Sequence, residues 1–375
     1  MIKNSKNEIL NLTKKLIAFK TVNGNGKEIA LCFDFIKKYF EVEIVSKKII
    51  VKEYKKNGVL SLALSNRNTL KPDIIFNGHI DVVNAEDKLF TPVVKNGKLY
   101  GRGAADMKNQ VATMMAVLKD LINSEFKKSI SLILNSDEEM GGCNGVKYLV
   151  EEIGYRAKVA IIPDGSYNFD IVEKQKGGFW IKFVSHGKSA HASRFWLGEN
   201  AILKLTDFYG DLIKIFPPLK KTKLLYQDGV SINLGKINGG KSTNSVPETA
   251  EMHLDLRYSE KMDKRRILES IKKLSKKHKI SFEITDDVAM LETSPKNYYL
   301  KMFKNVVEKN LGRKVKIVKE TGASDARFFS KYNIPVIITV PNCGGFHEAG
   351  EWAEIKSLEK FYEVLREFVE KAARG

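Results

Sequence analysis

The chain has 375 residues, of which 43% are hydrophobic, so it is long enough for two domains and too apolar to be disordered. Its formal net charge of +18 would suit an anionic partner, but its densest basic run, residues 263–279, has apolar positions at helical spacing and is typical of a solvated helix face. Three cysteines without a CxxC pair indicate a reducing compartment, and no segment resembles a signal peptide or reaches membrane-spanning length. We therefore expect a soluble cytoplasmic protein that binds neither nucleic acid nor membranes.

Helices and strands alternate along the first 165 residues. Apolar residues at helical spacing predict helices over residues 4–18 and 27–39. Strand-like runs follow at 42–54, 59–65 and 72–80, and then come a helix at 107–121, a strand at 129–139, a helix at 145–153 and a strand at 158–165. This alternation predicts an α/β fold with a mostly parallel sheet and helices on both faces.

The pattern changes from about residue 173. Strands are predicted at 177–187, 229–239, 249–258 and 280–288, with helices at 199–215 and 260–278, which gives the β-α-β-β-α-β order of a split βαβ, ferredoxin-like domain. The chain then returns to helices at 299–311 and 357–373 and strands at 314–320 and 333–340. We therefore expect a catalytic domain of residues 1–172 and 291–375, with an inserted domain of residues 173–290.

Candidate metal ligands stand at the ends of the strand-like runs or in the loops beyond them. They are His79, Asp81, Asp106, Glu138, Glu139, Asp164 and His347. In α/β proteins, bound molecules and ions lie outside the carboxyl ends of the strands of the sheet. Zinc is coordinated by imidazole nitrogen and carboxylate oxygen, which these side chains provide. Taken singly, Asp106 could cap the helix that follows it and Asp164 could be a turn residue. The clustering of both ligand types favours a site for two metal ions, which one carboxylate can bridge.

Two spacings suggest a division of roles within this set. Asp81 follows His79 by two residues, and a metal-bound imidazole usually donates its other N–H to a carboxylate that fixes its orientation. Glu138 and Glu139 are adjacent, and neighbouring side chains of an extended segment point apart. One of the two glutamates can therefore hold a metal while the other acts as a general base.

Five motifs, GHIDVV, GRGAADMK, SDEE, IPDG and FHEAGE, resemble those of the di-zinc metallopeptidase family of succinyl-diaminopimelate desuccinylase, acetylornithine and acetyl-lysine deacetylases, aminoacylase and glutamate carboxypeptidases. The resemblance covers nearly the whole chain. It implies two Zn²⁺ per subunit, one held by His79, Asp106 and Asp164 and the other by Asp106, Glu139 and His347, with Asp106 bridging. It also implies that Glu138 is the general base and that Asp81 orients His79. Cobalt or manganese would suit the same ligands.

The resemblance extends to the inserted domain, which it identifies as a lid through which subunits form a homodimer. Within it, His191 would stabilise the tetrahedral oxyanion, often in the partner subunit's site, and Asn244 and Arg257 would hold the substrate carboxylate. In the later segment TGASDARFF, Ser324 and Arg327 would bind substrate. The alternatives are an ordinary strand-end histidine at His191 and an ordinary ion-pair partner at Arg257.

These inferences predict a cytoplasmic two-zinc amidohydrolase that cleaves an N-acyl amino acid with a free carboxylate, as a desuccinylase or deacetylase does. A broader carboxypeptidase or dipeptidase of the same family is the main alternative. A metal-bound protein without activity and a nucleic-acid-associated protein are further alternatives. The sequence departs from the family pattern at Asn109, Gln110, Ala323, Ala326 and Gly350, which leaves the substrate open.

Overall fold

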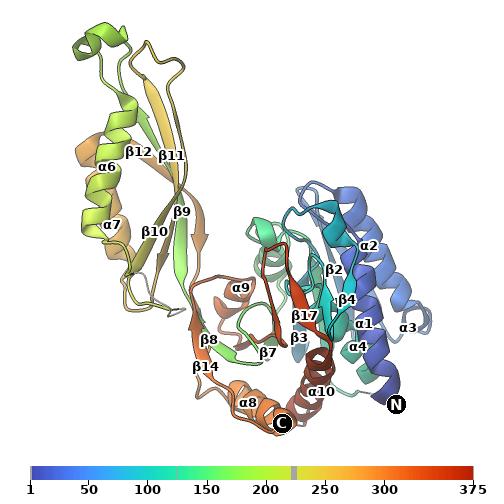
Figure 1. Cartoon of the computed structure of the whole chain (residues 1–375). Coiled ribbons are helices and arrows are strands. Elements are labelled where there is room, and N and C mark those ends of the chain that lie inside the picture. Colours follow the sequence, from blue (N-terminus) through green and yellow to red (C-terminus); the bar gives the residue numbers. More distant parts are fainter. Residues whose placement is uncertain (1, 125, 221–225, 375) are drawn as a thin grey trace. The chain divides into compact units, whose positions relative to one another are not determined.

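The computed structural model describes residues 2–124, 126–220 and 226–374, and the chain divides into two compact units (Figure 1). The first unit contains Met1–Lys174, Glu292–Val318 and Ser324–Gly375, and the second contains Gln175–Leu291 and Lys319–Ala323. The domain limits predicted from the sequence, after residues 172 and 290, remain a prediction. Among the described helices, none is both long enough and apolar enough to cross a membrane.

A six-stranded sheet with the strand order β1-β2-β6-β3-β7-β15 forms the centre of the first unit. Its strands are β1 (Ile50–Lys56), β2 (Val59–Ser65), β3 (Ile74–His79), β6 (Ile130–Asn135), β7 (Val159–Ile161) and β15 (Val336–Ile337). The strands β6, β3, β7 and β15 are parallel to one another, whereas β2 pairs antiparallel with both β6 and the edge strand β1. The predicted mixed α/β fold with a mostly parallel main sheet is therefore confirmed.

The central strands are buried along their whole length. All six residues of β3 and of β6 are buried, as expected for parallel strands that are covered on both faces. The main apolar core joins these strands to five helices: α1 (Ile2–Ala18), α2 (Gly26–Tyr39), α4 (Lys108–Asn123), α8 (Tyr298–Leu311) and α10 (Ile355–Ala372). The predicted helix over residues 145–153 is a short α5 (Val146–Tyr148) that continues as the π-helical turn η3 (Leu149–Ile153).

The strand predicted over residues 42–54 is only partly correct. Residues Glu41–Val45 form a short helix, α3, and the strand β1 begins at Ile50. The side chains of Val42 and Val45 are 73% and 78% exposed, whereas that of Glu43 is buried and accepts a hydrogen bond from Asn123. The two valines therefore do not mark the buried face here, because the side chain of Glu43, with Asn123 and Lys119 beside its carboxylate, occupies it.

Two smaller sheets accompany the main sheet, and the second of them includes residues assigned to each of the two units. One has the order β16-β17-β5-β4, with β16 (Cys343–Gly344), β17 (Trp352–Glu354), β5 (Lys98–Tyr100) and β4 (Val93–Lys95). Its β17 pairs antiparallel with β5, so that the chain near residue 351 lies beside the chain near residue 101. The other sheet has the order β13-β8-β14, with β13 (Leu291–Glu292), β8 (Ile171–Gln175) and β14 (Ile317–Glu320).

The second unit has a four-stranded antiparallel sheet of order β10-β11-β9-β12. In chain order its main elements are β9 (Gly177–His186), α6 (Ala201–Ile215), β10 (Val230–Gly239), β11 (Thr249–Tyr258), α7 (Lys264–His278) and β12 (Ile280–Val288). Along β11 buried residues alternate with more exposed ones, because only one face of the sheet packs against α6 and α7. The apolar core of this unit is separate from that of the first.

Truncation of Phe183 tests whether the second unit is held by its own core. Phe183 is fully buried and its ring lies 4.7 Å from that of Phe208 and 5.8 Å from that of Phe282, measured between centroids. We expect Phe183→Ala to lower the free energy of unfolding of this unit by about 3–5 kcal/mol, through lost burial and the cavity left behind. Urea unfolding followed by fluorescence and far-UV circular dichroism measures the loss.

The matched control is Ile215→Ala, which removes an exposed side chain of the same unit and should change the free energy by less than about 0.5 kcal/mol. The account predicts a transition of the second unit that moves to lower urea while the rest of the chain unfolds as before. One shared transition that moves as a whole would contradict separate cores.

Candidate metal centre

The candidate ligands gather at one edge of the main sheet. His79 is the last residue of β3, Glu138 and Glu139 begin the 3₁₀ turn η2 (Glu138–Met140) just after β6, and Asp164 follows β7. Because β6, β3 and β7 are parallel neighbours, their carboxyl ends lie at the same edge. The alternation of strands and helices seen in the sequence therefore places these side chains together.

Asp106 lies between two imidazoles. Its Oδ1 is 3.1 Å from Nε2 of His79, and its Oδ2 is 3.2 Å from Nε2 of His347. The same nitrogen of His347 lies 3.3 Å from Oε2 of Glu139. The helix α4 has Met107 as its N-cap and no side-chain capping bond, so the carboxylate of Asp106 is not a helix cap. Its two oxygens instead face two different nitrogen donors, as a bridging carboxylate requires.

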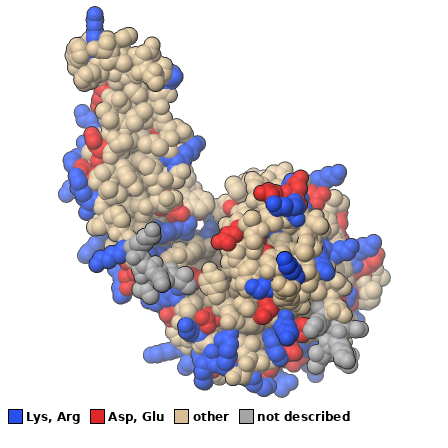
Figure 2. Space-filling view, in the orientation of Figure 1, with Lys and Arg blue, Asp and Glu red and all other residues tan. Residues whose placement is uncertain are grey.

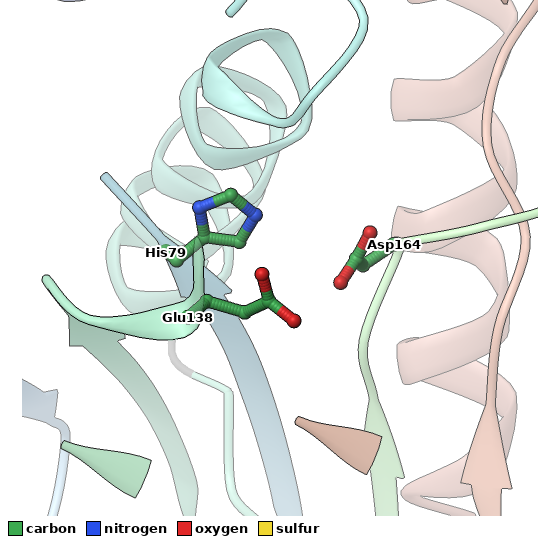
Figure 3. A group of neighbouring side chains, drawn as sticks. All are labelled: His79, Glu138 and Asp164. Carbon is green, nitrogen blue, oxygen red and sulfur yellow. The ribbon is translucent and has the colours of Figure 1, made fainter. Parts of the chain in front are cut away.

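Among the residues that the structure describes, two groups of three bring one potential ligand atom each to within 4.8 Å of one another. One group is His79, Asp106 and Glu139, and the other is His79, Glu138 and Asp164. Figure 3 shows the second group, in which the carboxylates of Glu138 and Asp164 point toward each other beside the ring of His79. The resemblance assigned Asp106, rather than Glu138, to the set with His79 and Asp164. The geometry therefore allows Glu138 to act as a ligand or as a base, and the assignment of roles remains a prediction.

Asp81 holds two members of this cluster in place. Nδ1 of the buried His79 lies 2.9 Å from the carbonyl oxygen of Asp81 and 3.5 Å from its Oδ1. Oδ2 of Asp81 accepts the backbone N–H of Glu139 at 3.0 Å. These contacts fix the ring of His79 with Nε2 directed at Asp106, which suits the orienting role that the sequence suggested.

The charges of the cluster are strongly coupled. Burial raises the pKa of Glu138 well above its usual value, and the nearby Asp164 adds to the effect. Burial likewise raises the pKa of Asp164, with a further contribution from Asp106. Hydrogen bonds to Asp106 and Glu139 raise the pKa of His347 to about 10. The cluster therefore concentrates negative charge in a poorly solvated place, where proton uptake relieves the repulsion.

The donor set fits divalent metal ions. Four carboxylates and two imidazoles meet there, and in the described ranges none of these carboxylates forms an ion pair with lysine or arginine. A divalent cation would supply the missing positive charge, and both donor types are ones that zinc accepts. The residues that could hold such ions are His79, Asp106, Glu138, Glu139, Asp164 and His347.

The predicted substrate residues of the first unit are not exposed. Ser324 and Arg327 are both buried, and Arg327 belongs to the short helix α9 (Ala326–Ser330). Nη2 of Arg327 donates a hydrogen bond to the carbonyl oxygen of Gly141 at 2.6 Å, and its guanidinium lies over the ring of Phe328. This guanidinium therefore supports the loop after Glu139, and its role toward a substrate remains a prediction.

Two of the predicted residues of the second unit lie close together. His191 forms an isolated bridge with Ser245, and the backbone N–H of Ala192 donates to the carbonyl oxygen of Asn244 at 2.9 Å. His191 is exposed, and its Nδ1 lies 2.7 Å from Oγ of Ser193. The side chains of His191 and Asn244 are therefore both accessible on neighbouring segments of this unit.

Arg257 is engaged by an acidic neighbour. Its Nε and Nη2 donate to the two carboxylate oxygens of Asp255, at 2.6 and 3.0 Å. This bidentate contact is the ordinary ion pair that was the alternative to a role of Arg257 in binding the substrate carboxylate. The proposal that Arg257 holds a substrate carboxylate is left as a prediction.

Several polar residues beside the candidate ligands were not predicted to have a role. Asp325 is buried and accepts a hydrogen bond from Nδ2 of Asn135, the last residue of β6, at 2.7 Å. Burial, with the nearby Asp137, raises the pKa of Asp325 to about 7. A Cβ on Gly142 would lie 2.2 Å from Oδ1 of Asp325, so this loop needs glycine there. The position of Asp325 inside the segment TGASDARFF was the only indication in the sequence that this residue lies near the site.

Two further residues that were given no role are Arg102 and Glu351. Both stand inside motifs that the sequence analysis quoted, GRGAADMK and FHEAGE. Both are buried and form an ion pair with each other. Their spacing in the sequence gives no indication of this contact, because it depends on the pairing of β17 with β5.

Comparison with known proteins identifies this class of site. Residues 75–371 match the model of Peptidase family M20/M25/M40, and the chain belongs to this family. It is thus a metal-dependent hydrolase that acts on amides, as the sequence analysis predicted.

Individual relatives differ in what they act on. The chain is 30% identical over 322 residues to a succinyl-diaminopimelate desuccinylase of Rickettsia bellii, covering 80% of this chain and 81% of the relative. Its fold is similar to that of an M20 family metallo-carboxypeptidase from Sulfolobus solfataricus (TM-score 0.80, 18% identity, 98% and 100% coverage). It is also similar to a dinuclear metal-binding peptidase of the M20 family from Bacillus subtilis (TM-score 0.68, 14% identity, 98% and 99% coverage).

Metal binding by the metal-free protein should release protons. The pKa of His347, raised to about 10 by Asp106 and Glu139, keeps this imidazole protonated at neutral pH, and a metal ion must displace that proton. The apparent zinc affinity should therefore rise with pH up to about 10, by about tenfold per pH unit for each proton displaced. Titrations against a competing chelator at several pH values measure the slope. A zinc affinity that does not change with pH would contradict this account.

Proposed function

We propose that the chain is a two-zinc amidohydrolase that cleaves the amide bond of an N-acyl amino acid. The observation that carries the proposal is the carboxylate of Asp106, whose two oxygens face His79 and His347 separately. One Zn²⁺ would be held by His79, Asp106 and Asp164, and the other by Asp106, Glu139 and His347. Co²⁺ or Mn²⁺ would suit the same ligands. The Bacillus subtilis relative, a dinuclear metal-binding peptidase, supports a pair of ions.

Glu138 is the proposed general base. When bound, the two ions would lower the pKa of a water molecule and polarise the scissile carbonyl. Glu138 takes the proton from the attacking water and delivers it to the nitrogen of the leaving amine. Its raised pKa suits a carboxylate that must accept a proton and give it up within one turnover. Asp81 keeps the ring of His79 in the orientation that the site needs.

The second unit supplies the proposed lid and dimerisation domain. Its β-α-β-β-α-β order and its antiparallel sheet support a ferredoxin-like domain inserted into the catalytic domain, with limits near residues 173 and 290. His191, exposed on this unit, would donate to the oxyanion, and Asn244 and Arg257 would hold the substrate carboxylate. Ser324 and Arg327 would line the substrate loop of the first unit.

The proposed substrate is a small N-acyl amino acid with a free carboxylate, handled in the cytoplasm. The Rickettsia bellii desuccinylase supports an N-succinyl substrate. The alternative is a carboxypeptidase or dipeptidase of broader specificity, which the Sulfolobus solfataricus relative supports. On the face in Figure 2, lysines and arginines are scattered with acidic residues among them, a pattern that supports a solvated surface over a nucleic-acid site.

Replacement of Glu138 tests the proposed base. We expect Glu138→Gln to lower kcat by about 10²- to 10⁴-fold on an N-acyl amino acid, because the carboxamide cannot take the proton from water. Two metal ions per subunit should remain bound, as measured by elemental analysis after gel filtration.

Glu139→Gln is the matched comparison, because it changes the adjacent carboxylate, which is a proposed ligand. It should lose metal as well as activity. Near-normal turnover of Glu138→Gln with both metals bound would rule out the base, and loss of a metal ion from Glu138→Gln would make Glu138 a ligand.

Apolar side chains next to His191 support the proposed homodimer. Phe195 and Trp196 lie in the 3₁₀ segment η4 (Ala192–Leu197) and are 68% and 66% exposed, and Leu197 and Leu203 are also exposed. Clustered apolar side chains of this size usually mark an interaction surface. A second copy of the chain is the proposed occupant, since it would cover them and bring His191 to the partner's site.

Trp196→Asp should therefore shift the protein from dimer to monomer in analytical ultracentrifugation. Activity should fall about 100-fold or more, because the oxyanion would lose a donor supplied by the partner. Val94→Asp, an exposed position of the first unit, is the control and should leave a dimer. A wild-type protein that is fully active as a monomer would refute the dimer.

A further inference from the structure

A buried ion pair, Arg102 and Glu351, is hydrogen-bonded to the backbone of two candidate ligands, Asp106 and His347. Arg102 follows β5 and Glu351 precedes β17, and the antiparallel pairing of these strands places the two residues side by side. Glu351 is 1% exposed and Arg102 is 3% exposed. Nη1 of Arg102 donates to Oε2 of Glu351. A buried pair of this kind needs further hydrogen bonds to offset the loss of solvation, and the loops that carry the ligands supply them.

Glu351 fixes the backbone of the loop that carries Asp106. Its Oε1 accepts the backbone N–H groups of Gly103, Ala105 and Asp106, at 2.9, 2.7 and 3.0 Å. Three N–H groups that converge on one carboxylate oxygen form strong, charge-assisted hydrogen bonds. The position of Asp106 along its loop is therefore set by a carboxylate that is not one of the candidate ligands.

Arg102 fixes the backbone of the second ligand. Its Nη2 donates to the carbonyl oxygen of His347 at 3.0 Å, while Nη1 remains on Glu351. One ion pair thus holds the backbones of both Asp106 and His347, whose side chains approach each other to 3.2 Å. The planar guanidinium suits this double contact, because its two terminal nitrogens point in fixed directions.

We propose that Arg102 and Glu351 are a positioning pair that sets the distance between Asp106 and His347 and so determines the affinity for the metal ion that these two ligands share. This inference rests on the metal centre proposed above. Coordination tolerates errors of only about 0.2 Å in ligand distance, so a shift of either loop weakens binding. The other proposed ion, which has His79 and Asp164 as ligands, depends on the pair only through Asp106.

Glu351→Gln is the first test. The carboxamide keeps the size of the side chain and one oxygen for the loop N–H groups, but its NH₂ group or the loss of charge disrupts the contact with Arg102. We expect the affinity for one of the two ions to fall about 10- to 100-fold, as for other residues that orient ligands, while the second ion binds nearly as in the wild type. Titration of the metal-free protein with Co²⁺ against a chelator, followed by visible absorption, resolves the two steps without any substrate.

Arg102→Lys gives a second, independent variant that also covers a failure of Glu351→Gln to fold. Lysine keeps the charge next to Glu351 but has a single nitrogen, so it cannot also hold the carbonyl oxygen of His347. The same selective weakening of one ion is expected. If either folded variant binds both ions with wild-type affinity, the proposal is overturned.

Glu43→Gln is the matched control. Glu43 is buried, accepts a hydrogen bond from Asn123 at 2.9 Å and lies 3.5 Å from Nζ of Lys119, but it contacts no candidate ligand. The Glu43→Gln variant should lower the melting temperature and leave both Co²⁺ affinities unchanged. It therefore distinguishes an effect on ligand position from a general loss of stability. Folded Glu351→Gln that binds two ions with wild-type affinity would overturn this proposal alone. A wild-type protein that binds no pair of ions would overturn the proposed function and this proposal with it.

Discussion

The gathering of carboxylates around two imidazoles at one edge of a parallel sheet is the constraint on which the rest of the structure depends. Removing water from several like charges is costly, and the raised pKa values of Glu138 and Asp164 show that cost. The fold offsets part of this cost by placing His79 and His347 against the two oxygens of Asp106, and divalent ions would complete the charge balance. The parallel strands β6, β3 and β7 make the arrangement possible, because their carboxyl ends coincide.

Much of this could be predicted from the sequence. Alternating apolar strands and amphipathic helices indicated the mostly parallel sheet, and the position of His79 and Asp164 after two of those strands indicated a shared edge. The motifs that resemble the metallopeptidase family indicated a metal-dependent hydrolase, which the family match confirms. The spacing of apolar residues and the position of ligand-type residues after strand-like runs are local features of the sequence. Predictions from them are correct here because the packing of the folded chain favours the same helices and strands.

The remaining features depend on contacts between distant parts of the chain. Residues 42–49 were predicted as part of a strand-like run, but the buried side chain is Glu43, whose partners Asn123 and Lys119 lie on α4. Arg102 and Glu351 are 249 residues apart and meet only because β17 pairs with β5. No pattern of spacing along the sequence encodes such a pair, and the pair itself holds the loops of two candidate ligands.

The most direct test of the central claim is a substrate panel on the metal-replete protein, with chelator-treated protein as the control. The panel would contain N-succinyl-diaminopimelate, N-acetylornithine, N-acetyl-lysine and a few dipeptides. The account predicts hydrolysis of one N-acyl amino acid that is lost on chelation and restored by zinc. Hydrolysis that survives complete removal of metal would contradict the account, and activity confined to dipeptides would contradict the proposed substrate class.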